Sequence, residues 1–358
     1  MMLLKAFFLL VPVVFTQAWA PSTKSRRNNG FTRLYMSADE FLVGVVGDLH
    51  MDPRKMEDYE IGRSHWEPIF AEAKEKHGNT ALVSLGDLGE SKSVRPKETS
   101  ELFAGTTECH ELAAKYLGSF GVPYDVIGGN HDLEGLDEFA TDQANLEMFL
   151  RVHNKPTPQF SRLVAEKTLL VGLSSTVFRD ARYTSHEVTI DDDQMNWFEE
   201  TLKTHPSSEG WKVFVFTHAP PNGSGLRVLQ ENHVVNGCCW LNHSDDKKCR
   251  KFIELVREHR CIKAWFSGHF HLGQDYQDSI SKLYSKLFHV SYNTWAYVTF
   301  SSHSVKPSPL SIPRMVPTPI VVLVFLCRPQ LCVEEPLAMV VSNPELLGEI
   351  RTALKYAQ

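Results

Sequence analysis

Gly128-Gly129-Asn130-His131-Asp132 is the stretch around which the chain is organised. It follows a short apolar run, residues 122–127, which predicts a buried strand. The glycine pair lets the backbone turn sharply where that strand ends. The turn then presents an amide oxygen, an imidazole and a carboxylate side by side, and these groups bind metal cations and transfer protons. The sequence therefore predicts a strand that delivers polar side chains to a functional site.

Four more polar clusters follow apolar runs in the same way. They are Gly47-Asp48-Leu49-His50 after residues 41–46, Gly86-Asp87-Leu88-Gly89-Glu90 after 81–85, His218 after 211–217, and Gly268-His269-Phe270-His271 after 261–266. The predicted strands alternate with predicted helices, which is typical of an α/β fold. Ligands of open α/β sheets bind beyond the carboxyl ends of the strands. Five clusters at five strand ends therefore predict one shared site.

The spacing of the acidic and histidine residues indicates two metal ions. Asp48 and His50 are separated by one residue, and so are His269 and His271. Side chains alternate along an extended segment, so each pair places two ligands on one face. Two neighbouring cations need a bridging ligand, for which a carboxylate is well suited. A single Asp or His after a strand is usually a cap or a solvated loop residue, so the prediction depends on the whole set.

The ordered set of clusters resembles the calcineurin-like metallophosphoesterase superfamily over roughly Phe41 to His271. The resemblance implies an α/β fold of the metallophosphoesterase type, a β-sandwich of two mixed sheets flanked by helices, with the site at the strand ends. It assigns one metal to Asp48, His50, Asp87 and His271, and the second to Asp87, Asn130, His218 and His269. Asp87 would bridge the two. His131 would act as general acid or charge stabiliser, and Asp132 would orient His131.

The resemblance also implies hydrolysis of a small phosphomonoester or phosphodiester by a hydroxide that bridges the two metals. Asp, Asn and His ligands suit Mn, Fe or Zn as divalent or trivalent ions. Glu90 stands three residues after Asp87, where purple acid phosphatases place a metal-bound Tyr, and the Asp-Arg-Gly signature of Ser/Thr protein phosphatases is missing. The alternative is a non-catalytic scaffold of this fold that binds a protein partner. Such members usually lack the His of Asn-His, which this chain keeps as His131.

Composition and charge limit the range of partners. The chain has 358 residues, of which 42% are hydrophobic, and its net charge is -6 without a basic stripe. No nucleic-acid partner is expected, which disfavours nucleases that share these clusters. Seven scattered cysteines do not form a disulfide framework. The loop 220–243, directly after His218, is predicted to contact substrate. The histidines that fit no cluster are interpreted as ordinary, and they include His110, His186, His233 and His243, of which His243 is also considered as an alternative substrate contact.

Four segments are predicted along the chain: a signal peptide at 1–20, a transit-like basic linker at 21–38, the metallophosphoesterase domain at 39–300, and a Pro/Ser-rich tail of uncertain fold at 301–358. The apolar run 6–15 is too short to span a bilayer, and Ala18-Trp19-Ala20 indicates cleavage. Several Lys and Arg residues follow this cleavage signal, and the first acidic residue of the chain is Asp39. This presequence resembles that of algae with complex plastids and predicts a plastid location. Secretion or an endomembrane lumen is the alternative, and no membrane span is predicted in the mature protein.

The region after the first cluster predicts a loop and then a helix. Residues 52–63 are polar and carry no clear period. Ser64 and Glu67 have the spacing of a capping box, which predicts a helix start at that point. Gly78 is the predicted end of this helix.

Overall fold

The computed structural model describes residues 41–77, 79–92, 94, 102–182, 184–224 and 240–270, and the backbone of four further strands between 287 and 340. The chain divides into two compact units, residues 1–35 and 36–358, and every described residue belongs to the second. The predicted presequence (1–38) lies outside the described residues and remains a prediction. The same holds for His233 and His271.

The described strands form two mixed sheets, one of six strands and one of five. The first has the order β11-β10-β9-β1-β2-β3 and the second the order β4-β5-β6-β7-β8. The first sheet consists of β1 (Phe41–Gly47), β2 (Thr80–Ser84), β3 (Tyr124–Val126), β9 (Thr294–Phe300), β10 (Val321–Leu326) and β11 (Leu337–Val340). The second consists of β4 (Phe160–Ala165), β5 (Thr168–Leu173), β6 (Lys212–Thr217), β7 (Ile262–Ser267) and β8 (Leu287–His289).

Parallel pairing brings the carboxyl ends of the strands that precede the polar clusters to a common edge within each sheet. Strands β1, β2 and β3 are parallel to one another, and so are β5, β6, β7 and β8. Strand β9 pairs with β1 in the antiparallel sense, as β4 does with β5. All five predicted apolar runs are strands with shifts of one or two residues at their ends. The predicted architecture, two mixed sheets flanked by helices, is confirmed.

Alternation along β1 explains the layered core. Phe41, Val43 and Val45 belong to a buried cluster that also contains Phe214 and Phe216 of β6, so these residues lie between the sheets. Leu42 and Val46 of β1 belong instead to the cluster that packs beneath the helices. Side chains of a strand alternate between its faces, and both faces of β1 are covered. A strand buried on both faces has a continuous apolar sequence, as this one has.

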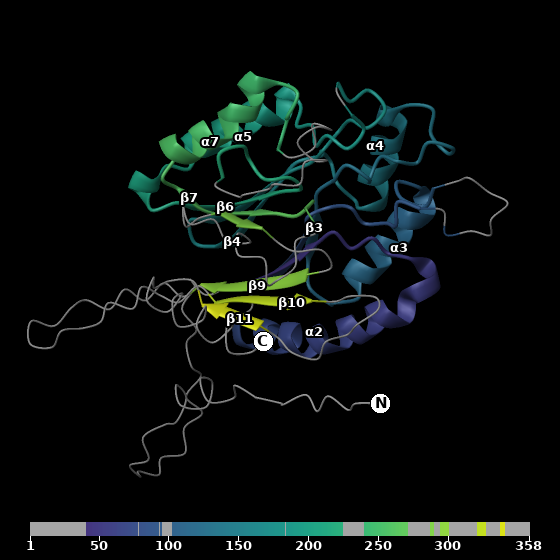
Figure 1. Ribbon diagram of the computed structural model, residues 1–358. Helices are drawn as coiled ribbons and strands as arrows, with labels where there is room; N and C mark the ends of the chain where they lie inside the picture. Colours follow the sequence, from purple (N-terminus) through teal and green to yellow (C-terminus); the bar gives the residue numbers. More distant parts are fainter. Residues whose placement is uncertain are drawn as a thin grey trace, which may run out of the picture. The chain divides into compact units, whose positions relative to one another are not determined.

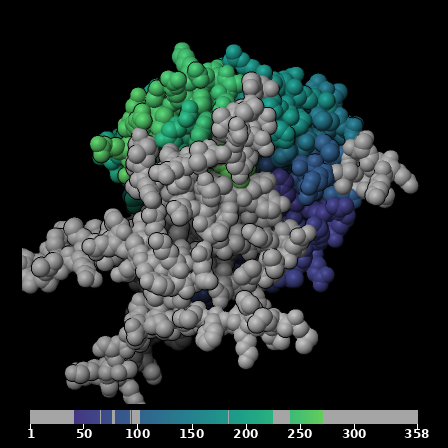
Figure 2. Space-filling model, in the orientation of Figure 1, coloured from purple at the N-terminus to yellow at the C-terminus, as the bar shows by residue number. Residues whose placement is uncertain are grey.

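Helices cover the outer face of each sheet (Figure 1). They are α2 (Met56–His77), α3 (Thr107–Gly118) and α4 (Asp142–Val152) on the first sheet, and α5 (Asp192–Thr204) and α7 (Asp246–Glu258) on the second, with short 3-10 turns η1 (Pro53–Lys55) and η2 (Ser207–Glu209). Side chains of Thr or Asp at the N-caps of α3, α4, α5 and α7 accept backbone N–H groups that the helix cannot satisfy. Lys248 and Lys251 of α7 form ion pairs with Asp192 and Glu199 of α5. The green part of the chain, which contains α7, lies together on one side of the surface in Figure 2.

The predicted loop at 52–63 is wrong, because α2 already begins at Met56. The Ser64 hydroxyl donates to the carbonyl of Ile61 inside the helix, so the predicted capping box does not form. Tertiary packing explains the early start. Tyr59 is buried, and its hydroxyl donates to the backbone carbonyl of His50 at 2.8 Å. The first turns of α2 thus pack against the first polar cluster, a contact that local propensity does not report.

Strands β10 and β11 come from the predicted tail of uncertain fold. Strand β10 pairs with β9, and β11 pairs with β10, both antiparallel. These strands extend the sheet that contains β1. Among the described residues, no helix combines the length and the apolar character that a bilayer crossing requires. The predicted domain boundaries at 39–300 and 301–358 remain predictions.

Two buried histidines, His110 in α3 and His153 at the end of α4, predict that acid lowers the stability of the fold. Nδ1 of His110 lies 3.3 Å from Nε2 of His153. Burial lowers the pKa of His110, and burial together with His110 and Lys155 holds the pKa of His153 well below its usual range. The unfolded chain therefore binds protons below pH about 6.5 that the folded chain rejects. Stability is complete above that pH and falls below it, by up to about 1.4 kcal/mol per pH unit for each histidine.

The measurement is urea unfolding of wild type and His153→Gln between pH 7.5 and 5.5. The variant is expected to lose less stability over this interval than wild type, because one proton-rejecting group is gone. An identical pH dependence in the two proteins would contradict the prediction.

Candidate metal centre

The structure brings together six of the seven predicted metal ligands. All six side chains are buried and follow the carboxyl ends of five parallel strands: Asp48 and His50 after β1, Asp87 after β2, Asn130 after β3, His218 after β6 and His269 after β7. The seventh, His271, lies outside the described residues. Residues separated by up to 221 positions thus meet at one place, where the His269 N–H donates to the Asp48 carboxylate at 2.9 Å.

The six side chains contain two groups that could each hold a cation, and Asp87 belongs to both. One group is Asp48, His50 and Asp87, and the other is Asp87, His218 and His269. Within each group the potential ligand atoms lie within 4.8 Å of one another. Oδ2 of Asp87 lies 3.1 Å from Nε2 of His218 and 3.7 Å from Nε2 of His50. Asp87 is therefore placed between the two groups, as a bridging carboxylate must be.

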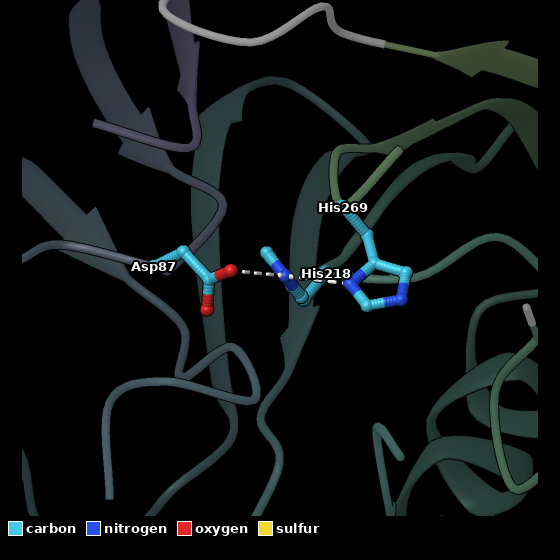
Figure 3. Close-up of side chains that lie close together, drawn as sticks. All are labelled: Asp87, His218 and His269. Atoms are coloured by element: carbon cyan, nitrogen blue, oxygen red, sulfur yellow. Dashed lines mark hydrogen bonds and ion pairs between the residues drawn. The ribbon is translucent and has the colours of Figure 1, made fainter. Parts of the chain in front are cut away.

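His218 has a defined tautomer. Its Nδ1 lies 2.7 Å from the carbonyl oxygen of Leu85, so Nδ1 carries the proton and donates it. The other nitrogen, Nε2, points at Asp87 and lies 3.3 Å from Nδ1 of His269 (Figure 3). A backbone carbonyl that orients a ligating imidazole is a common support for a metal site.

The backbone is strained at the predicted ligands. Seven described non-glycine residues have a left-handed φ, and four of them are predicted ligands: Asp48, His50, Asp87 and His269. This conformation costs about 1–2 kcal/mol for an ordinary residue. Such strain is found chiefly where function requires a geometry that the chain would not otherwise adopt. The same turns are closely packed, since a Cβ on Gly268 would lie 2.4 Å from Oδ2 of Asp48.

One buried atom of the site has no partner among the described residues. Oδ1 of Asn130 accepts a hydrogen bond from none of them. An unsatisfied buried acceptor normally costs about 1–3 kcal/mol, whereas a cation would satisfy it. The donor set of carboxylate oxygens, imidazole nitrogens and one amide oxygen also matches the preferences of Mn, Fe and Zn. The residues present therefore fit the two-metal cofactor that the sequence predicts.

The buried carboxylates also attract positive charge. Burial opposes ionisation of Asp87, but the imidazoles of His218, His131 and His50 hold its pKa well below the usual range. Burial likewise disfavours charge on His218, yet Asp87 and Asp48 raise its pKa to about 9. The field at the site thus favours cations.

The prediction that Asp132 orients His131 is wrong. The Asp132 carboxylate accepts three backbone N–H groups, from Gly129 at 2.6 Å, Asp87 at 2.8 Å and Leu88 at 2.9 Å. It therefore fastens the turn after β3 to the turn after β2. Nδ1 of His131 instead contacts Oε2 of Glu134 at 2.8 Å. Burial lowers the pKa of His131, but Asp87 and Glu134 raise it to about 9.

Glu134 is consequently a positioning residue for His131. Its replacement by Gln removes a charge-assisted hydrogen bond, and loss of such a supporting group typically costs about 10- to 100-fold in activity. If the chain hydrolyses phosphoesters, as the sequence resemblance implies, Glu134→Gln is expected to reduce turnover of alkyl esters by this factor and to leave turnover of nitrophenyl esters nearly unchanged, because a nitrophenolate needs no proton to depart. Glu111→Gln, an exposed change on α3, is the control. An equal loss on both ester classes would contradict the assignment.

Sequence reasoning also missed His186. Its Nδ1 lies 3.5 Å from Nδ2 of Asn130, and its ring centroid lies 5.3 Å from that of His131. Glu134 could have been suspected, because it stands only three residues after His131. No local signal marks His186, which is 56 residues from Asn130. Residues 225–239 of the predicted substrate loop lie outside the described part of the chain.

Comparisons with known proteins agree with this geometry. The model of the calcineurin-like phosphoesterase family matches residues 41–273, which span all the polar clusters. No curated protein matches the chain. One similar solved structure is the TT1561 protein of Thermus thermophilus, with a TM-score of 0.41 and 11% identity, covering 72% of this chain and 93% of that one. A second is GAP50, the anchor in the inner membrane complex of Plasmodium, with a TM-score of 0.47 and 10% identity, covering 88% of this chain and 95% of that one. A third is a cold-active protein-tyrosine phosphatase of Shewanella, with a TM-score of 0.33 and 9% identity, covering 86% of this chain and 82% of that one. The chain belongs to the calcineurin-like phosphoesterase family.

Proposed function

We propose that the protein is a dinuclear-metal phosphoesterase that hydrolyses a small phosphomonoester or phosphodiester. The observation that carries this proposal is the pair of buried ligand groups that share Asp87. A bridging carboxylate between two groups of His and Asp residues is the arrangement that two-metal hydrolysis requires. The membership of the chain in its family supports the same reaction class.

The proposed ligands divide between the two groups. Asp48, His50 and His271 would hold one metal, Asn130, His218 and His269 the other, and Asp87 both. When bound, a pair of such cations supplies an acidified water as nucleophile and neutralises charge on the phosphate oxygens. The ligand types suit Mn, Fe or Zn, and the choice among them depends on geometry and supply.

His131 is the proposed general acid. Its ring lies beside the proposed ligand His50, with centroids 5.7 Å apart, and its side chain is 14% exposed. The Glu134 carboxylate accepts from Nδ1, which leaves Nε2 as the nitrogen that can protonate a leaving alkoxide. The His131 N–H also donates to Oδ1 of Asp87 at 2.9 Å, so the backbone of the acid is fixed to the bridging carboxylate.

His131→Ala is expected to keep its metals and to lose about a hundred- to ten-thousand-fold in turnover of alkyl phosphoesters, the usual contribution of general acid catalysis. Esters with a nitrophenolate leaving group should lose much less. Metal content is measured alongside the rate. An unchanged rate on alkyl esters would rule out the role.

The test of the function uses residues 39–358 and two substrates, an aryl phosphodiester and an aryl phosphomonoester. Each is measured with added Mn²⁺ and again after chelation. Metal-dependent turnover of either establishes the reaction class, and the ratio of the two rates separates diesterase from monoesterase. A folded, metal-loaded protein that turns over neither substrate would contradict the proposal and favour the alternative, a scaffold of this fold that binds a protein partner.

A further inference from the structure

His186 is an exposed residue beside the proposed metal centre. The proposed metal ligands around it are buried, whereas the His186 side chain is exposed. It belongs to the segment between β5 and α5, and that segment is well anchored. Oε1 of the buried Glu187 accepts the N–H of Ser244 at 2.7 Å, and the carbonyl of Val188 accepts the N–H of Asn242 at 2.9 Å. An exposed imidazole on fixed backbone can meet a ligand without a rearrangement.

The contact with Asn130 defines the donor that His186 presents. Oδ1 of Asn130 is the buried oxygen that accepts no hydrogen bond from the described residues, and Nδ2 of the same amide faces Nδ1 of His186. An amide NH₂ group can only donate, and therefore Nδ1 of His186 accepts. The imidazole must then carry a proton on Nε2, whether the ring is neutral or charged. Nε2 of His186 can therefore donate a hydrogen bond in both protonation states of the ring.

His186 also lies next to the proposed acid. The rings of His186 and His131 meet edge to face, at an interplanar angle of 70°. His131 delivers its proton to the oxygen of the departing group, so its exposed neighbour faces the part of the substrate attached to that oxygen. An N–H at this place recognises an oxygen acceptor, such as a hydroxyl group, close to the scissile bond.

We propose that His186 is a substrate-binding residue that donates a hydrogen bond from Nε2 to an oxygen on the leaving group. The natural substrate is accordingly an ester of an alcohol that carries a further oxygen acceptor, such as a hydroxyl group, rather than of a simple hydrocarbon alcohol. This inference depends on the proposed phosphoesterase function and deepens it.

The experiment compares two esters that differ only in hydroxyl groups, glycerol 2-phosphate and isopropyl phosphate, or their methyl diesters if wild type is a diesterase. Wild type, His186→Ala, His186→Gln and a control at the end of α7, His259→Ala, are assayed with Mn²⁺, and metal content is determined for each. The ratio of kcat/KM for the two esters is the readout, because the intrinsic reactivities cancel when variants are compared.

We expect His186→Ala to lower that ratio roughly 3- to 10-fold, the usual effect of one neutral hydrogen bond, with unchanged metal content. His186→Gln keeps an N–H donor and should recover part of the ratio, and His259→Ala should not change it. An equal loss on both esters, or a loss that follows metal content, would overturn this inference and leave the phosphoesterase function standing. A folded, metal-loaded wild type that hydrolyses no ester would overturn both.

Discussion

Gly129→Ala is expected to lower the free energy of unfolding by about 3 kcal/mol and to abolish metal binding. A Cβ at this position would lie 2.3 Å from Oδ1 of Asp87, 2.8 Å from the backbone nitrogen of Asp87 and 2.9 Å from Cε1 of His218. All three atoms belong to the proposed ligands Asp87 and His218, and Oδ1 of Asp87 is held in place by the N–H of His131. The methyl group therefore displaces the ligands themselves.

The measurement is urea unfolding together with metal analysis of the purified protein. Gly118→Ala is the matched control, because a Cβ there meets nothing within 4 Å and the residue ends helix α3. Alanine has the higher helix propensity, so the control should be neutral or more stable by up to about 1 kcal/mol. If Gly129→Ala had the same free energy of unfolding as wild type and bound both metals, the claim that a methyl group at this position displaces the ligands would be contradicted.

Asp87→Asn is the second change with a large expected effect. The side chain keeps its shape, but the negative charge shared by both ligand groups is lost. We expect the variant to lose at least one metal per chain. Its activity should fall by about a thousand-fold or more, since removal of a single preorganised electrostatic group already costs about a hundred- to a thousand-fold.

The fold should survive this substitution. The amide oxygen can still accept from the N–H of His131, and the new NH₂ group can donate to Nε2 of His218, which already carries its proton on Nδ1. Asp137→Asn, an exposed change in the loop after the site, is the control. Metal analysis that found both sites full in Asp87→Asn would count against the bridging role.

The core strands and the convergence of the proposed ligands were predictable because both leave local patterns. Strand β1 is buried on both faces, so Phe41 to Val46 is apolar without interruption apart from Gly44. Each polar cluster stands directly after such a run. Parallel strands deliver their carboxyl ends to a common edge, and for that reason sequence order alone indicated that Asp48, Asp87 and Asn130 would meet.

Contacts between distant segments could not be predicted in this way. The early start of α2 depends on the hydrogen bond from Tyr59 to the carbonyl of His50. The prediction for Asp132 was wrong for a similar reason. Sequence adjacency paired this carboxylate with the imidazole of His131, but the carboxylate accepts three backbone N–H groups of the adjoining turns instead. Buried N–H groups must be satisfied, and only the folded arrangement shows which side chain is within reach.

The sequence by itself therefore determined the fold class, the five strand ends and the set of proposed metal ligands. The tertiary structure decided which carboxylate supports His131, which exposed histidine lies beside Asn130 and His131, and which buried oxygen accepts no hydrogen bond from the described residues. The division follows from the range of the interactions. Hydrophobic periodicity and strand-end motifs are local properties of the chain, whereas hydrogen bonds such as the one between His131 and Glu134 depend on backbone conformation and packing that form only in the folded domain.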